Sequence, residues 1–450
     1  MTAAINGDIF AIPFSGRYVV YSPLRRIAFL CDEPVVKYLG RVSRGNLESQ
    51  NPEDRMALEF LRCHPPLPAS PFEPEGCSAS TEFSPTDATL FLTNGCSLRC
   101  IYCYASAGSA PAMRMDYATA KRGIDFIVRN ALRKGTKSVT VGFHGGGEPT
   151  THWTVLTRSL LYAKRVAGEN GLAVHASLTT NGVFSERQCR WILGNMTEVN
   201  FSLDGSPAIQ DLQRPLASGN PSSPIVMRTI ADFDRADFPY AVRMTVTSHA
   251  VDSLAENVVY ILQHARPKRI QAEPVYRVGR GKDRSLQIDA EKFIHAFRRA
   301  RIAAREHGAE LAYSAADLNR ISNRFCQSCG EGFNLTPRGN ISACFEVCDE
   351  GVEFSEEYIF GRYDTASKAY EFNFEILARL RGRTVEKVDW CQGCFGKWHC
   401  SGDCHYQSRL SSAKGTFHGS PRCEINRALI LDQILERIEA SGGEIWAGGS

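Results

Sequence analysis

Between residues 85 and 280, short apolar runs alternate with longer amphipathic stretches. The apolar runs are typical of buried strands and lie at residues 88–93, 138–143, 173–178, 199–203, 241–247 and 269–273. Between them, helical patterns occupy residues 153–167 and 254–265, and Asp116 and Ser185 are suitable N-caps for two further helices, the first ending before Gly135. Six strand–helix units in succession predict parallel strands with right-handed crossovers. Because six units are too few to close an eight-stranded barrel, we predict an α/β fold, a partial (β/α)6 TIM-like barrel.

The segments on either side of this core have different patterns. Residues 17–21 and 25–31 predict a hairpin, helical patterns follow at 34–39 and 52–62, and residues 65–85 carry six prolines, which is typical of an extended linker. Residues 289–306 predict a basic amphipathic helix that ends at Gly308. We therefore divide the chain into a small N-terminal α+β segment (1–84), the core (85–308), a cysteine-rich domain (309–428) and a C-terminal helix and tail (429–450).

Composition narrows the class of protein. A chain of 450 residues can hold two or three domains, and its 43% hydrophobic and 22% charged residues are ordinary for a globular protein. The net charge of +3 gives no case for nucleic acid or an anionic membrane as a partner. No apolar run approaches the roughly 18–20 residues that span a bilayer, and the N-terminus lacks the pattern of a signal peptide. We expect a cytoplasmic protein.

Sixteen cysteines change this picture. The cytosol keeps thiols reduced, so a disulfide framework is not expected there, and clustered reduced cysteines indicate metal instead. Most of them fall into two groups, at residues 96–103 and 326–423. The two groups lie in the predicted core and in the cysteine-rich domain, respectively.

The first group, Cys96, Cys100 and Cys103, has the spacing C-x3-C-x2-C directly after the first predicted strand. Three thiolates can ligate three corners of a [4Fe–4S] cluster, which leaves one iron open to a substrate or cofactor. A zinc knuckle or a set of structural thiols is the alternative. The run, including the aromatic Tyr102, resembles the signature of radical S-adenosylmethionine (radical SAM) enzymes. That resemblance implies that the open iron binds the amino and carboxylate groups of S-adenosylmethionine, and that a one-electron cleavage yields a 5′-deoxyadenosyl radical that abstracts hydrogen from the substrate.

Further strand ends carry residues that resemble the cofactor-binding motifs of this family. Consecutive glycines allow close approach of the backbone to a ligand, and the run after the second strand resembles the family's Gly-Gly-Glu-Pro motif. A buried Arg in the fifth strand requires an anionic partner, either the cofactor carboxylate or a structural carboxylate. The resemblance implies that the polar residues at the third and fourth strand ends contact the ribose of the cofactor, with ordinary turn chemistry as the alternative. It also implies that residues 271–276 line the adenine or substrate side. The predicted cofactor-binding residues are Tyr102, Gly145, Gly146, Gly147, Glu148, Thr179, Asn181, Ser202, Asp204 and Arg243.

The second group resembles the SPASM domain of radical SAM peptide-modifying enzymes. Eight of its nine cysteines, all except Cys348, suffice for two fully ligated [4Fe–4S] clusters, giving three clusters in all, with two zinc sites as the alternative. The resemblance assigns one cluster to Cys326, Cys329, Cys344 and Cys404, and the distal cluster to Cys391, Cys394, Cys400 and Cys423. Cys348 is the rival of Cys326 as a ligand.

The resemblance spans residues 85–425 and implies a maturase that acts on a ribosomally made precursor peptide, with flavodoxin or ferredoxin as electron donor. The product would be a carbon–carbon, carbon–oxygen or thioether crosslink, or an epimer, for which a spare thiol such as Cys77 or Cys348 would return hydrogen. One alternative is oxidation of a protein Cys or Ser by a sulfatase-maturing type of enzyme, but Phe345 stands where those enzymes carry an aspartate base, with Glu346 beside it. The other is a non-catalytic iron–sulfur carrier or sensor.

The peptide partner has two candidate binding regions. The N-terminal segment faintly resembles winged-helix elements that bind leader peptides by strand addition, with a packing extension of the barrel as the alternative. The basic stretch 277–284 and the helix with Arg298, Arg299, Arg301 and Arg305 would favour an acidic peptide, unless these charges form only a solvated face.

Overall fold

The computed structural model of the chain describes residues 3–6, 8–42, 82–109, 111–411, 419–443 and 445–447, together with Cys63 and Phe417. The chain divides into two compact units. The larger comprises residues 80–313 and 326–382, and the smaller comprises residues 1–79, 314–325 and 383–450. The predicted helix at 52–62, almost all of the proline-rich stretch 65–85 and Cys77 lie outside the described residues.

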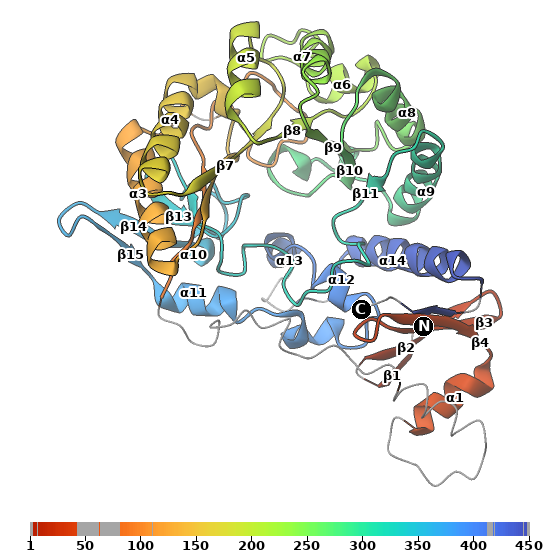
Figure 1. Ribbon diagram of the computed structural model, residues 1–450. Helices are drawn as coiled ribbons and strands as arrows, with labels where there is room; N and C mark the ends of the chain where they lie inside the picture. The colour runs from red at the N-terminus through yellow and green to blue at the C-terminus, as the bar shows by residue number, and fades with distance from the viewer. Residues whose placement is uncertain are drawn as a thin grey trace. The chain divides into compact units, whose positions relative to one another are not determined.

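The larger unit is built on one curved sheet with the strand order β11-β10-β9-β8-β7-β6-β5-β12-β13-β14-β15. All neighbours from β5 to β11 are parallel, and β12 is parallel to β5. The helices of this unit lie on the outer side of the parallel strands (Figure 1). The first part of the unit contains β5 (Asp87–Leu90), α3 (Tyr117–Lys134), β6 (Ser138–Phe143), η1 (Pro149–His152), α4 (Trp153–Glu169), β7 (Ala173–Thr180), α5 (Glu186–Asn195), β8 (Glu198–Ser202), α6 (Pro207–Gln213), α7 (Ser223–Arg235), β9 (Tyr240–Val246), α8 (Leu254–His264), β10 (Arg269–Pro274), η2 (Gly279–Lys282), η3 (Arg284–Leu286), α9 (Ala290–Glu306) and β11 (Leu311–Ala312).

This arrangement confirms the predicted α/β fold with a partial barrel of parallel strands. All six predicted strands are present, and the predicted caps form as expected. Asp116 accepts a hydrogen bond from the Thr119 amide at the start of α3, Gly135 ends that helix in the left-handed conformation, and Ser185 makes a capping box with Gln188. The first strand is shorter than predicted, because after Leu90 the chain leaves the ladder to form the loop that carries Cys96.

Four strands after the barrel extend the same sheet, which the sequence pattern did not predict. They belong to the segment 326–382, which contains β12 (Asn334–Leu335), β13 (Asn340–Ser342), α10 (Ser355–Tyr358), β14 (Ile359–Asp364), β15 (Ala369–Phe372) and α11 (Phe374–Arg381). β12 pairs with β5 and begins an antiparallel meander. The cysteine-rich segment that follows the barrel is therefore joined to the strand from which the Cys96 loop departs.

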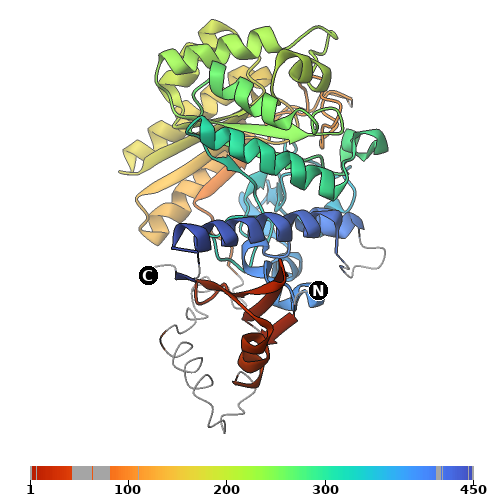
Figure 2. The same cartoon turned by 90° about the vertical axis from the view of Figure 1, so that its right-hand side faces the viewer.

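The smaller unit contains a five-stranded antiparallel sheet in the order β1-β2-β3-β4-β16. The predicted hairpin is β3–β4, and the predicted helix after it is α1. The C-terminal strand β16 pairs with β4, and α14 runs along this sheet (Figure 2). The elements of the unit are β1 (Ala3–Asn6), β2 (Ile9–Phe14), β3 (Arg17–Ser22), β4 (Ile27–Cys31), α1 (Glu33–Val42), η4 (Val385–Lys387), η5 (Asp389–Cys391), α12 (Lys397–Cys400), α13 (His405–Ser411), α14 (Pro421–Ala440) and β16 (Ile445–Ala447).

Among the helices that the structure describes, none combines the length and apolar character needed to cross a bilayer.

Candidate active site

The loop that carries Cys96, Cys100 and Cys103 is held firmly in the barrel. Leu98, Cys100 and Tyr102 are buried together with Val275 and Leu286. The loop backbone also bonds to the segment after α6, through the Arg99 amide to the Pro215 oxygen (2.8 Å) and the Ile101 amide to the Gln213 oxygen (2.9 Å). The three sulfurs therefore come from one ordered loop at the carboxyl end of a barrel strand, where functional loops of such folds lie.

Arg280 of η2 binds the same loop from the other side. Its Nε donates to the Cys100 oxygen (2.8 Å), its Nη1 to the Ala107 oxygen (3.3 Å), and its backbone amide to the Cys103 oxygen (3.0 Å). The sequence left open whether the basic stretch 277–284 favours an acidic peptide or forms only a solvated face; Arg280, a member of this stretch, positions the cysteine loop. The sequence gave no signal for that role, because the two segments are far apart along the chain.

N–H groups surround the three sulfurs. The Leu98 amide donates to Cys96 Sγ and the Ala107 amide to Cys103 Sγ, both at 3.4 Å. Arg214 Nη1 lies 3.9 Å from Cys100 Sγ, and Asn181 Nδ2 lies 3.6 Å from Cys96 Sγ. Hydrogen bonds to the sulfurs are one of the means by which proteins tune iron–sulfur clusters, so these donors fit the predicted group.

Burial favours the protonated form of the thiols in this loop. Burial, followed by the charge of Glu148, raises the pKa of Cys96 to about 12. Burial also raises the pKa of Cys100 to about 11, although Arg214 opposes this. Thiols bind metal as thiolates, so loading of this site releases protons. Within the described part of the chain, no three His, Cys, Asp or Glu side chains converge on a position for a single metal ion; the cluster assignments remain predictions.

The glycine run after β6 packs directly against the cysteine loop. The Gly147 amide donates to the Thr93 oxygen (2.7 Å) and the Glu148 amide to the Gly95 oxygen (2.8 Å). A Cβ atom added to Gly147 would lie 2.0 Å from the Gly95 oxygen, and Gly145 and Gly146 have φ angles of 81° and 64°. The run therefore serves close backbone packing beside Cys96, in addition to its predicted contact with the cofactor.

Replacement of Gly147 by Ala is accordingly expected to displace the cysteine loop, since backbone rather than a flexible side chain occupies the space. We expect less iron per chain after anaerobic reconstitution and weaker binding of S-adenosylmethionine. The matched control is Gly168→Ala, because Gly168 in α4 has open space around its Cβ position. Iron analysis and equilibrium dialysis measure both effects, and a Gly147→Ala protein indistinguishable from Gly168→Ala would refute this role.

Glu148 connects the glycine run to the loop after β7. Its Oε1 accepts from Thr150 Oγ1 and Thr180 Oγ1, both at 2.8 Å, and its Oε2 accepts from the Asn181 amide at 2.8 Å. Burial raises the pKa of Glu148, while these hydrogen bonds act in the opposite direction. Asn181 in turn donates to Ser97 Oγ (3.0 Å), so three predicted cofactor segments form one structure around the first cysteine.

The next two predicted residues occupy neighbouring strands. Thr179 of β7 and Ser202 of β8 are half-buried, and neither hydroxyl hydrogen-bonds to another described residue. Asp204, in contrast, is fully buried and has both carboxylate oxygens engaged within the protein. The predicted contacts of all three with the ribose remain predictions.

Asp204 is the centre of a buried network. Arg214 Nε donates to its Oδ2 (2.9 Å) and Arg214 Nη2 to its Oδ1 (3.2 Å), the Thr245 amide donates to Oδ1 (2.9 Å), and Gln213 Nε2 donates to Oδ2 (2.7 Å). The Tyr102 hydroxyl also donates to Oδ2. Burial alone would lower the pKa of Arg214, but the charges of Asp204, Tyr102 and Cys100 together outweigh burial, and the pKa is raised.

The same network reaches the cysteine loop. The Arg214 guanidinium lies 5.1 Å from the centre of the Tyr102 ring. Sequence reasoning missed Gln213, the last residue of α6, and Arg214 directly after it, because the pattern did not predict this helix. The network holds the aromatic residue of the cysteine motif and places a positive charge beside Cys100.

Arg243 and His144 face a common space inside the curved sheet. Arg243 lies on β9 and is exposed rather than buried as predicted, and its side chain makes no hydrogen bond or ion pair with the described residues. His144 follows β6, and burial together with the charge of Arg243 lowers its pKa to about 4. The strands β7 and β8 separate β6 from β9, so the charge of Arg243 acts on His144 across the interior of the curved sheet. No ion pair within 4.0 Å joins Arg243 to a carboxylate of the described residues, so the anionic cofactor remains its predicted partner.

Replacement of Arg243 by Ala is expected to weaken binding of S-adenosylmethionine about tenfold or more, since a hydrogen bond to a charged group contributes about 1.5–3 kcal/mol. Arg243→Lys should retain part of the affinity, because a lysine keeps the charge but not the forked geometry. Arg165→Ala, at an exposed site paired with Glu169, is the control. Equilibrium dialysis reports the result; unchanged affinity in Arg243→Ala would assign the residue to another ligand.

The cysteines after the barrel are divided between the two units. Cys326, Cys329, Cys344 and Cys348 belong to the larger unit, whereas Cys404 belongs to the smaller one. Burial, and then the charges of Glu346 and Cys326, raise the pKa of Cys344 well above its usual value, so Cys326 and Cys344 are neighbours. The predicted ligand set that includes Cys404 spans both units and remains a prediction.

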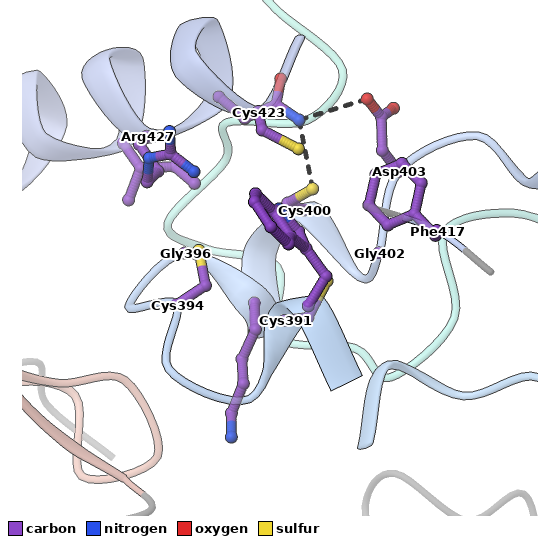
Figure 3. A pocket seen from close by; sticks show the side chains of 13 residues that line it. Cys391, Cys394, Gly396, Cys400, Gly402, Asp403, Phe417, Cys423 and Arg427 are labelled. Atoms are coloured by element: carbon purple, nitrogen blue, oxygen red, sulfur yellow. Dashed lines mark hydrogen bonds between the residues drawn. The ribbon is translucent and has the colours of Figure 1, made fainter. Parts of the chain in front are cut away.

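The four predicted distal ligands line one pocket of the smaller unit (Figure 3). Cys391, Cys394 and Cys400 follow each other along the short helices η5 and α12, and Cys423 lies in the first turn of α14. Asn426 Nδ2 donates to Cys400 Sγ (3.1 Å), and the Ser420 amide donates to Cys423 Sγ (3.4 Å). As at the first site, N–H donors are directed at the sulfurs, which fits the predicted cluster.

The turn beyond Cys400 has an unusual backbone. Ser401, Gly402 and Asp403 have φ angles of 51°, 79° and 58°, the left-handed region that non-glycine residues seldom adopt. A buried ion pair between Arg422 Nε and Asp403 Oδ2 (2.9 Å) stabilises this turn. It fixes the short connection from Cys400 to Cys404.

Comparison with known proteins agrees with this geometry. A model of the Radical SAM superfamily matches residues 90–256. Residues 90–256 of the chain therefore resemble a radical SAM domain. Proteins of that superfamily bind S-adenosylmethionine and a [4Fe–4S] cluster, and the match, together with the relatives described below, confirms the predicted likeness to radical SAM enzymes of the sulfatase-maturing kind. The match begins within β5 and ends within α8, so it contains the cysteine loop, the glycine run and Arg243.

Two curated relatives extend beyond the radical SAM domain. The chain is 22% identical over 320 residues to a serine-type anaerobic sulfatase-maturating enzyme of Klebsiella aerogenes, covering 69% of this chain and 76% of the relative. It is 29% identical over 224 residues to the sporulation killing factor maturation protein SkfB of Bacillus subtilis, covering 47% and 48%. The chain also spans 57% of an uncharacterized protein of Methanocaldococcus jannaschii, at 26% identity over 38% of this chain.

Two solved structures share the fold. The anaerobic sulfatase-maturating enzyme anSMEcpe with bound AdoMet superposes with a TM-score of 0.63 at 17% identity, covering 79% of this chain and 96% of that chain. SuiB of Streptococcus suis bound to its precursor peptide SuiA gives a TM-score of 0.53 at 14% identity, covering 94% and 99%. At these identities the likeness concerns the fold.

Proposed function

We propose that this radical SAM enzyme is a maturase that modifies a ribosomally made precursor peptide by crosslinking or epimerisation. Three loops that meet around Cys96 would hold the cluster and S-adenosylmethionine: the cysteine loop, the glycine run, and the loop of Asn181. When bound, this cofactor pair supplies a carbon-centred radical able to remove hydrogen from an unactivated carbon. Of the chain's own residues, Arg243 and the backbone of Gly145–Glu148 would hold the cofactor. Glu148, Arg214 and Arg280 fix the positions of the loops relative to one another.

The observation that carries the choice of product is Phe345. It follows Cys344 at the position where sulfatase-maturing enzymes have an aspartate base, and it packs on His144 (ring centres 4.9 Å apart) and Phe91 (6.1 Å). The apolar ring of Phe345 supplies no base at this position, and the neighbouring His144 is a weak base because burial lowers its pKa to about 4. SkfB is named as a peptide maturation protein and SuiB was solved with a precursor peptide, which supports the same class of substrate.

Sulfatase-type oxidation of a protein side chain is the second candidate. It is favoured by the match to the Klebsiella enzyme over three quarters of that protein's length. In that case Glu346, one residue further along, would serve as the base.

The test begins with a search of the neighbouring reading frames for a short precursor peptide, which then serves as the test substrate. Anaerobic incubation with S-adenosylmethionine and reductant should leave the peptide lighter by two hydrogens if it is crosslinked, or unchanged in mass but containing a D-residue if it is epimerised. The Cys100→Ala protein is the control for uncatalysed change. Conversion of a sulfatase peptide to formylglycine, with no change in the precursor peptide, would replace this function by the second candidate.

We further propose that the two cysteine sets after the barrel hold two auxiliary clusters. Replacing Cys391 and Cys423 together should lower the iron content from about twelve to about eight per chain, because each [4Fe–4S] cluster is held by four thiolates. Cys189→Ala, in α5, should leave iron unchanged. Zinc in the reconstituted wild-type protein, with about four irons, would contradict both auxiliary clusters.

A further inference from the structure

The strand β15 ends the sheet of the larger unit with one edge unpaired. β15 pairs with β14 on one side, and no further strand of the described residues follows it in the order of that sheet. Figure 1 shows β14 and β15 as a hairpin at one end of the sheet. Such an edge leaves backbone N–H and C=O groups free to pair with an extended chain. A peptide can therefore add to β15 as a further strand.

Two hollows lie beside this edge, one on each face of the sheet. Glu371 is opposite Arg362 and Phe372 is opposite Gly361, so the side chains of Glu371 and Phe372 point to opposite faces. A hollow of about 650 Å³ is lined by Arg362 and Glu371, and a second, of about 390 Å³, lies on the face of Phe372. Because successive side chains of a strand point to opposite faces, a strand added to β15 would direct alternate side chains into the two hollows.

The smaller hollow is a groove between α3 and the end of β15. Its apolar lining consists of four phenylalanines, Phe83, Phe126, Phe372 and Phe374. The Phe372 ring packs against Phe83 (ring centres 5.2 Å apart) and against Phe126 (5.9 Å), whereas Phe374 is 37% exposed. The floor of the groove is therefore fixed by ring packing, and one ring is available to contact an apolar side chain of a ligand.

Two arginines lie on the α3 side of this groove. Arg133 pairs with Glu82 (2.7 Å), which is the one acidic side chain among the described residues that line the groove. Arg129 is exposed and pairs with no carboxylate of the described residues. A carboxylate of the ligand would complement this charge. The groove thus fits an extended peptide that has an apolar side chain with an acidic residue close to it.

We propose that β15 and the groove between β15 and α3 bind a recognition segment of the precursor peptide by strand addition. This proposal rests on the proposed maturase function and adds to it a docking surface for the peptide, apart from the radical SAM site. The recognition segment pairs with the free edge of β15, places an apolar side chain against Phe374, and places an acidic side chain near Arg129. Recognition and modification then involve different parts of the peptide.

The position of β15 sets the spacing between these two parts. In the order of the sheet, β15 is four positions from β5, the strand from which the cysteine loop departs. Adjacent strands are roughly 4.8 Å apart, so four positions correspond to about 19 Å along the sheet. An extended chain covers about 3.3 Å per residue. About six residues are therefore enough to connect the recognition segment to the residue that is modified.

The affinity of the reconstituted enzyme for the fluorescein-labelled precursor peptide, measured by fluorescence anisotropy, tests the docking surface. Arg129→Glu is expected to raise Kd about tenfold or more, and the effect on peptide modification should appear in KM rather than in kcat. The matched control is Lys134→Glu, which makes the same charge change on α3 outside the groove. Phe374→Ala should weaken binding in the same way, whereas Leu161→Ala, which removes an exposed apolar side chain from α4, should not.

Hydrogen exchange tests the strand addition itself. Backbone amides of residues 369–373 are expected to exchange several-fold more slowly when the peptide is bound, because the added strand pairs with this edge. Peptide binding that leaves exchange of these amides unchanged would contradict strand addition. Slower exchange that depends on enzyme concentration without peptide would assign the edge to a second copy of the chain and overturn the proposal.

The remaining outcomes separate this inference from the proposed function. Wild-type affinity in Arg129→Glu and Phe374→Ala, or equal weakening by Lys134→Glu, would refute the docking surface even if the peptide is modified. A peptide that binds with the expected effects but is never modified by the wild-type enzyme would refute the maturase function and leave the docking surface in place. A precursor peptide that the wild-type enzyme does not bind would overturn the inference.

Discussion

Replacement of Cys100 by Ala is expected to abolish cleavage of S-adenosylmethionine and to remove about four irons per chain, the content of one [4Fe–4S] cluster. Cys100 is the central thiol of the loop, is buried, and is the sulfur that faces Arg214. With only two thiolates left, two irons of the cluster lack a cysteine ligand. The cluster is then held less firmly, and the cofactor has no single open iron to bind. Iron analysis and chromatography of 5′-deoxyadenosine measure both effects.

The control for this experiment is Cys189→Ala, because Cys189 is also buried within the same unit but lies in α5. It should retain the wild-type iron content and activity. If Cys100→Ala still cleaved the cofactor at a wild-type rate, the loop would not be the site of the reactive cluster.

Replacement of Asp204 by Ala is expected to destabilise the larger unit by about 3–5 kcal/mol, because removing one partner of a buried ion pair leaves the other charge uncompensated. Arg214 and Asp204 are almost fully buried, with exposed side-chain fractions of 8% and 0%. The loss also removes hydrogen-bond acceptors from Tyr102 and Gln213. Asp204→Asn, which keeps part of the hydrogen bonding, should fall between the wild type and the alanine variant.

The matched control is Asp252→Ala, whose carboxylate pairs with Lys292 at an exposed position. Exposed pairs contribute about 0–1 kcal/mol, so this variant should unfold close to the wild type. Urea unfolding under anaerobic conditions, followed by circular dichroism, compares the three variants. Equal midpoints for Asp204→Ala and Asp252→Ala would show that the network does not support the fold.

Much of the barrel follows from local sequence signals. The apolar runs locate the strands because buried parallel strands are apolar on both faces, and Asp116 and Ser185 mark helix starts through hydrogen bonds to the first turn. The elements that the pattern missed depend on distant partners. β12 and β13 are two and three residues long and are strands only because they pair with β5 and with each other. Likewise, β16 is formed by pairing with β4.

The residues of the candidate site also fall into those that local sequence predicts and those that depend on distant contacts. Spacing alone identifies Cys96, Cys100 and Cys103, since the motif lies within eight residues of one loop. Arg214 and Arg280 act through contacts across long sequence separations, so no local pattern indicates them. Glu148 and Asp204 were predicted as cofactor contacts, and the structure adds that both organise the loops from within the protein.

The most direct test of the account uses electron paramagnetic resonance on anaerobically reconstituted, reduced protein in which Cys391 and Cys423 are replaced. Addition of S-adenosylmethionine labelled with 17O in its carboxylate should broaden the signal of the cluster bound by Cys96, Cys100 and Cys103, because the carboxylate binds the iron that has no cysteine ligand. A signal that the labelled cofactor leaves unchanged would contradict an open iron at this site.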